Sequence, residues 1–81
     1  MNNIWHNNEE RPKNGYYIVG LTCSKYSDNT EKWGFIIGDY AISSRDGIER
    51  VYEEENCIRY SEIIKWAYYE DFVNYIKSEI L

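Results

Sequence analysis

Few side chains in this sequence belong to the types that catalysis commonly uses. His6 is the only histidine, and Glu9 and Glu10 follow it within a polar stretch. An imidazole beside a carboxylate is the basis of general acid–base catalysis, provided that the fold holds both groups in place. The polar surroundings of His6 instead predict a solvated side chain in a mobile segment.

The two cysteines, Cys23 and Cys57, lie 34 residues apart. Neither belongs to a Cys-x-x-Cys pair, and no cluster of His or Cys accompanies them, so the sequence predicts neither a zinc site nor an activated thiol. Cys23 comes late in an apolar strand and Cys57 is next to Ile58, and both positions are typical of small buried residues. We therefore expect reduced thiols and no disulfide.

The densest cluster of acidic side chains is the run Glu53, Glu54 and Glu55. Calcium loops place their ligands at alternating positions and use glycine for the sharp turn, whereas three consecutive side chains point in different directions. The run therefore predicts a solvated loop without metal. The five glycines form neither a Gly-x-Gly-x-x-Gly motif nor a phosphate-binding loop. We expect a protein that is not an enzyme and carries no cofactor.

The elements that position these side chains belong to a chain of 81 residues, which we expect to form one domain. A chain of this size buries only about 60% of the surface that its unfolded form exposes, so its stability margin is thin. We divide the chain into a polar N-terminal segment (1–15), a sheet (16–68) and a helix (69–80).

Several segments have the β-branched and aromatic composition of strands. They are residues 16–24, 33–42 and 48–52, with 57–60 as an extension of a neighbouring strand. Asp46-Gly47 predicts a hairpin turn between the second and third of them. Gly34 and Gly38 indicate a bulge or a close approach of backbones in the second.

The stretch "IIKWAYYEDF" (63–72) combines two apolar periods. Ile64, Trp66 and Tyr68 share one face at a period of two, which predicts a strand over 63–68. From residue 69 the apolar spacing becomes helical, and the acidic residues at 70 and 71 suit the first turn of a helix, where the helix dipole favours negative charge. A single helix starting with Ser61 as its N-cap is the alternative reading. We favour strand and then helix because the period changes at residue 69.

Together these segments predict an α+β fold, in which one C-terminal helix packs on a small antiparallel β-sheet of three to five strands. The first 12 residues lack the basic start and apolar centre of a signal peptide, and no apolar run reaches the ~20 residues of a membrane helix. We expect a cytoplasmic protein that has no contact with a membrane.

The net charge of -5 argues against a protein that grips phosphate backbones directly. Residues 1–40 carry five acidic and four basic side chains, whereas residues 41–81 carry nine acidic and five basic ones. An electrostatic partner is therefore expected to be basic and to meet the second half of the chain. A homodimer is also compatible with the sequence.

The order of landmarks resembles a family of small uncharacterised proteins of phages and prophages. The landmarks are Trp5, Pro12 and Gly15, followed by "YYIVG" and, near the end, "IIKWAY". The resemblance spans roughly residues 4 to 68. The usual ending of that family, a His-Trp-Met run followed by a proline, is replaced by Lys65-Trp66-Ala67-Tyr68, and a helix is added. The family has no established activity, so the resemblance implies a phage genomic context and no mechanism.

Three classes of function fit these features. The first is a phage-type accessory protein that inhibits a host defence or nucleic-acid-handling protein, in the manner of an anti-CRISPR protein, by covering a basic surface. Its expected binding surface consists of Tyr52, Glu53, Glu54, Glu55, Tyr68, Tyr69, Glu70 and Asp71. The second class is an oligomeric binder of a nucleotide signal that uses Arg45, Arg50 or Arg59. The third is a structural or assembly protein of a virion.

Overall fold

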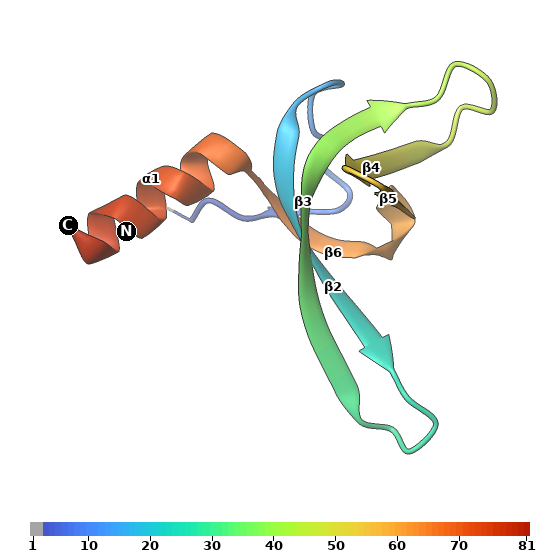
Figure 1. Cartoon of the computed structure of the whole chain (residues 1–81), viewed down its shortest axis with the longest axis horizontal. Helices are drawn as coiled ribbons and strands as arrows, with labels where there is room; N and C mark the ends of the chain where they lie inside the picture. Colours follow the sequence, from blue (N-terminus) through green and yellow to red (C-terminus); the bar gives the residue numbers. More distant parts are fainter. Residues whose placement is uncertain (1–2) are drawn as a thin grey trace.

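A long hairpin of two antiparallel strands forms the centre of the molecule (Figure 1). The computed structural model describes residues 3–81. Strand β2 (Tyr17–Lys25) pairs along its whole length with strand β3 (Glu31–Ile42), from Tyr17 opposite Asp39 to Lys25 opposite Glu31. The turn between them places Asn29 at a φ of 68°, a left-handed conformation that asparagine tolerates better than most residues.

Four further strands flank this hairpin. They are β1 (His6–Asn7), β4 (Glu49–Glu53), β5 (Asn56–Arg59) and β6 (Ile63–Tyr68), and the sheet order is β1-β6-β2-β3-β4-β5 with antiparallel pairing throughout. A 3-10 turn, η1 (Tyr60–Glu62), leads from β5 at one edge to β6 near the other. The predicted α+β fold with an antiparallel sheet is confirmed.

The predicted strand number of three to five is wrong, because residues 3–81 form six strands. The strand that sequence analysis missed is β1, which pairs His6 with Trp66 and Asn7 with Lys65. His6 and Asn7 are both polar, so the sequence shows no apolar alternation at this point. They form a strand only because their backbone pairs with the edge of β6. Residues 6–7 of the N-terminal segment are thus part of the sheet.

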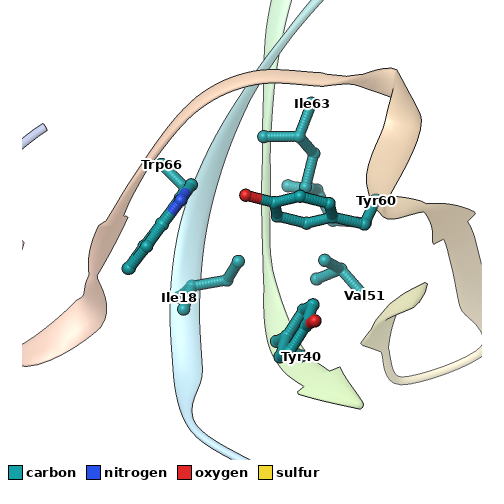
Figure 2. Packing of buried hydrophobic residues seen from close by; sticks show 7 residues of the cluster. Ile18, Tyr40, Val51, Tyr60, Ile63 and Trp66 are labelled. Atoms are coloured by element: carbon teal, nitrogen blue, oxygen red, sulfur yellow. The ribbon is translucent and has the colours of Figure 1, made fainter. Parts of the chain in front are cut away.

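One face of the sheet carries the hydrophobic core (Figure 2). The buried cluster comprises Ile18, Ile36, Tyr40, Val51, Tyr60, Ile63 and Trp66. The rings of Tyr40 and Tyr60 meet edge to face, with their centroids 5.3 Å apart, an arrangement that aromatic pairs prefer. Three of the seven buried side chains, from β3, η1 and β6, are therefore large aromatic residues.

The polar tips of these aromatic residues hold the N-terminal segment in place. The Tyr60 hydroxyl lies 2.7 Å from the carbonyl oxygen of Asn8 and 2.8 Å from that of Glu10. The indole N–H of Trp66 donates to the same Glu10 carbonyl at 2.8 Å. Arg11 adds an ion pair with Glu49, at 2.8 Å between Nε and Oε1. The expectation of a mobile segment around His6 is therefore wrong, because a buried Tyr and Trp need acceptors that this segment supplies.

A bulge in β6 changes which of its residues face the core. Leu21 pairs with Lys65 but Thr22 pairs with Ile63, so Ile64 is the extra residue. Ile63 consequently reaches the buried cluster, whereas Ile64 is 41% exposed. The predicted shared face of Ile64, Trp66 and Tyr68 is wrong at its first position.

Helix α1 (Tyr69–Ile80) follows β6 directly, so the alternative of one long helix from Ser61 is excluded. The helix contacts β2 and β6, and its Phe72 ring lies edge to face with Trp5 at 6.2 Å. None of its residues is buried, and Ile80 is 74% exposed. The helix is thus held through its first turns and then projects from the sheet (Figure 1), instead of packing along its length.

The backbone of Gly38 in β3 lies close to the backbone at the end of β4. A Cβ atom at this position would lie 2.1 Å from the Tyr52 carbonyl oxygen. At Gly34 the nearest atom to such a Cβ would be the Thr22 hydroxyl at 3.5 Å, which is ordinary contact. The sequence indicated either a bulge or a close approach of backbones at these glycines, and the structure shows a close approach at Gly38.

This contact predicts opposite outcomes for two equivalent substitutions. Gly38→Ala should lower the free energy of unfolding by about 3 kcal/mol, because the clash is with backbone that cannot rotate away. Gly34→Ala should change it by less than about 1 kcal/mol, and a small gain is expected from the stiffer unfolded chain. Urea denaturation followed by circular dichroism measures both. Equal effects of the two substitutions would contradict the close approach at Gly38.

The buried tyrosines predict a loss of stability at high pH. Burial, together with a 2.9 Å hydrogen bond to Glu49, raises the pKa of Tyr40 to about 12, and burial also raises the pKa of Tyr60. A tyrosine in the unfolded chain has a pKa of about 10, so stability should be constant below about pH 10 and fall as the pH rises towards 12. Tyr40→Phe should make this alkaline loss shallower, and Tyr26→Phe, in an exposed turn, should not. An alkaline profile that Tyr40→Phe leaves unchanged would refute the assignment.

Candidate functional site

The face of the sheet opposite the core carries a row of tyrosine and carboxylate side chains. Tyr17, Asp39 and Tyr52 are direct cross-strand neighbours on β2, β3 and β4. Their sequence neighbours Ile18, Tyr40 and Val51 point into the core, so the alternation of a strand turns these three side chains outward. Tyr17 is 45% exposed and Tyr52 is 40% exposed.

The start of α1 extends this row. The Tyr69 ring lies edge to face with Tyr17, at 4.8 Å between centroids. On the β4 side of this pair lies a shallow hollow of about 480 Å³. It is lined by Tyr17, Ile37, Asp39, Tyr52, Glu53, Glu54 and Tyr69.

A second hollow of about 380 Å³ lies on the other side of the same ring pair. It is lined by Lys13, Tyr16, Tyr17, Tyr68, Tyr69, Glu70 and Asp71. Tyr17 and Tyr69 line both hollows, so the two form one surface. We call the residues that line them the tyrosine–carboxylate face.

The two acidic segments that the sequence placed in one binding surface do lie together. Tyr52, Glu53 and Glu54 line the first hollow, and Tyr68, Tyr69, Glu70 and Asp71 line the second. Glu55 lines neither hollow and lies exposed in the turn after β4. The pair of Tyr17 and Tyr69 is what joins the segments.

Sequence analysis missed five residues of this face: Lys13, Tyr16, Tyr17, Ile37 and Asp39. Alternation within β2 and β3 shows that Tyr17 and Asp39 face away from Ile18 and Tyr40, which is a signal available in the sequence. Tyr17 lies beside the start of α1 because β2 pairs with β6. The sequence does not reveal this pairing.

The face has a strongly negative character. Five carboxylates line the two hollows, from Asp39, Glu53, Glu54, Glu70 and Asp71, and Lys13 is the one basic residue among the lining residues. The Lys13 ammonium lies 5.6 Å from the Tyr16 ring centroid, within the range of a cation–π contact. Such a surface attracts cationic groups and repels phosphates.

Glu53 has a structural role beside its place in this face. Its Oε2 accepts a hydrogen bond from the backbone N–H of Ile37 at 2.9 Å. The ladder between β3 and β4 begins only at Asp39, so this carboxylate replaces a missing strand partner. The predicted solvated loop is correct for Glu54 and Glu55, which form an exposed two-residue turn, and wrong for Glu53, which ends β4.

His6 and Glu10 form a fixed pair, at 3.0 Å between Nδ1 and Oε2. The imidazole stacks on Trp66 with a centroid distance of 4.3 Å, and a third of the His6 side chain remains exposed. The structure therefore corrects the expectation of a solvated histidine. His6 therefore packs against Trp66 at the end of the core.

The cysteines differ from the expected pair of buried residues. Cys23 is half-buried on β2, whereas Cys57 is exposed on β5 opposite Tyr52. Within residues 3–81, no group of three or more His, Cys, Asp and Glu side chains is arranged to hold a metal ion. In the same range, no helix has the length and apolar character needed to cross a membrane.

Comparison of the chain with protein-family models, curated proteins and solved structures gave no match. The resemblance to phage and prophage proteins therefore stays a prediction. The geometry of the tyrosine–carboxylate face is the observation on which a function can be proposed.

The hydrogen bond from Ile37 to Glu53 yields a stability test within the acidic run. Glu53→Ala should lower the free energy of unfolding by about 1–3 kcal/mol, because it leaves a partly buried amide without an acceptor. Glu53→Gln keeps an oxygen acceptor and should cost less. Glu55→Ala, in the exposed turn, should stay within about 0.5 kcal/mol of the unchanged protein. Chemical denaturation compares the three variants, and a Glu53→Ala as stable as Glu55→Ala would contradict this role.

Proposed function

We propose that this protein acts by binding another protein through the tyrosine–carboxylate face, and that the bound surface of the partner is basic. The single observation that carries the proposal is the contiguity of exposed tyrosines and carboxylates across β2, β3, β4 and the start of α1. Tyrosine gives a large contact area with a polar tip and is enriched at binding hot spots. Carboxylates around it steer a basic partner and fix its orientation.

The exposed tyrosine area is a substantial part of a protein interface. Tyr16, Tyr17, Tyr52 and Tyr69 are 50%, 45%, 40% and 38% exposed. An aromatic side chain buries about 150–250 Å², so the four together offer roughly 350 Å². A specific complex buries about 800 Å² on each partner, and these rings supply nearly half of that.

The proposed biological role is inhibition of a host protein in the host cytoplasm by a phage-type accessory protein. Proteins that handle nucleic acids, including CRISPR effectors, bind phosphate backbones through clustered Lys and Arg. A face with five carboxylates offers such a cluster the same sign of charge as the nucleic acid. Binding at that cluster would exclude the nucleic acid by competition. The phage-like order of sequence landmarks supports this context.

The nucleotide-signal alternative gains no support from the site, because phosphate recognition needs basic donors. Lys13 is the one basic residue that lines the two hollows. Arg50 is paired with Asp46, at 3.0 Å between Nη2 and Oδ2, and lies outside both hollows. No observation favours the virion-assembly alternative either.

Charge variants of the face test the proposal. The face variant combines Glu54→Lys with Glu70→Gln and Asp71→Asn, and it leaves Glu53 and its hydrogen bond intact. The control variant, Glu9→Lys with Glu79→Lys, changes the net charge by the same four units at exposed positions outside the face. Pull-down from a bacterial host lysate and mass spectrometry identify the partner captured by the unchanged protein.

Association of that partner is then measured by surface plasmon resonance at low and at high salt. The face variant should associate at least about tenfold more slowly at low salt, and the difference should shrink as salt screens the charges. The control variant should associate within about twofold of the unchanged protein. If both variants associate equally slowly, the effect comes from net charge alone and contradicts the proposal. If the face variant binds as well as the unchanged protein, the binding surface lies elsewhere.

A further inference from the structure

The outer half of β3 has one edge without a strand partner. Strand β4 pairs only with Asp39–Ile42, so residues 31–37 are paired on the β2 side alone. The backbone N–H of Tyr40 donates to Tyr16 next to β2, and peptide groups alternate in direction along a strand. The N–H and C=O groups of Glu31, Trp33 and Phe35 therefore point outward at the free edge.

At the Ile37 end of this edge, the backbone N–H donates a hydrogen bond to the Glu53 carboxylate and is therefore not free to pair with another strand. What remains open is the segment 31–35, on the part of the hairpin that extends away from the rest of the sheet (Figure 1). Unpaired edges of this kind template pairing with another strand unless charge, proline or a bulge blocks them. Proline and a bulge are both absent from this edge of β3, and its two charged residues, Glu31 and Lys32, have opposite signs and lie at one end of the segment.

Two large aromatic side chains lie exposed beside the open edge. Trp33 is 57% exposed and Phe35 is 63% exposed. Both lie on the same face of β3, next to half-buried Leu21 and Cys23, their cross-strand neighbours on β2. An exposed apolar patch on an unpaired strand marks an interaction surface.

We propose that this edge pairs with the same edge of a second copy of the chain, in an antiparallel register centred on Trp33. The open segment is complementary to itself in this register. Glu31 of each copy lies opposite Phe35 of the other, and the two Trp33 residues face each other across the two-fold axis. All three outward peptide groups then exchange hydrogen bonds, and the two sheets become one.

Charge permits a second copy as the occupant, and the self-complementary register favours it. Residues 21–37 contain Lys25 and Lys32 against Asp28 and Glu31, so the hairpin is neutral, whereas the whole chain has a net charge of -5. The hairpin is thus a part of the molecule where two acidic chains can meet without strong repulsion. A basic partner, by contrast, gains nothing from a neutral surface. This pairing does not depend on the function proposed for the tyrosine–carboxylate face.

The area available predicts a weak dimer. Two copies of Trp33 and Phe35 offer roughly 500 Å² of exposed aromatic surface, from about 150–250 Å² per side chain. With the flanking backbone the interface falls at the small end of specific contacts, below about 1,200 Å². Dissociation constants on the order of micromolar are expected for such an interface.

Sedimentation equilibrium over increasing protein concentration tests the dimer. The unchanged protein should move from the chain mass of 9.8 kDa to twice that mass. Trp33→Lys should weaken the association at least about tenfold while circular dichroism shows an unchanged fold. Tyr26→Lys places the same charge in the exposed hairpin turn, outside the paired segment, and should leave the dimer intact.

Amide hydrogen exchange tests the pairing itself and contains its own control. The amides of Trp33 and Phe35 should become protected as the concentration rises, whereas those of Lys32 and Gly34 face β2 and should be protected throughout. A monomer at every concentration would overturn the proposal, as would self-association without new protection at residues 33 and 35. A dimer that persists in Trp33→Lys would also overturn it and would move the contact to the exposed end of α1.

Discussion

Burial of aromatic rings with polar tips is the constraint on which the rest of this structure depends. A small core that contains Tyr40, Tyr60 and Trp66 must supply an acceptor for each O–H and N–H that it removes from water. Glu49 serves Tyr40, and carbonyl oxygens of the N-terminal segment serve Tyr60 and Trp66. Among the described residues, no buried side-chain polar atom lacks a partner. A polar segment thereby becomes an integral part of the fold.

The strands that build this core also present the candidate site, because alternate side chains point to opposite faces. Tyr40 and Val51 enter the core, and Asp39 and Tyr52 face outward beside them. The close approach at Gly38 accompanies the departure of β4 from β3. The contact between Gly38 and the Tyr52 backbone thus lies next to the acidic hollow near Glu53 and next to the free edge of the hairpin.

The two surfaces differ in the physical chemistry that they offer. The tyrosine–carboxylate face combines negative charge with amphipathic rings, which suits a basic protein surface and excludes phosphate. The hairpin edge offers backbone hydrogen bonds and apolar aromatic area in a neutral surrounding. The proposed partner binding and the proposed self-association therefore rely on different interactions.

The sequence by itself determined the fold class, the boundary between β6 and α1 at Tyr69, and the acidic character of the second half of the chain. These features depend on periodicity and charge, which are local. Tertiary structure alone decided that His6 belongs to a strand, that Ile64 bulges out of its predicted face, and that Tyr17 joins the two acidic segments. Those outcomes depend on strand pairing over long sequence separations, where geometry and the need for hydrogen-bond partners override local pattern.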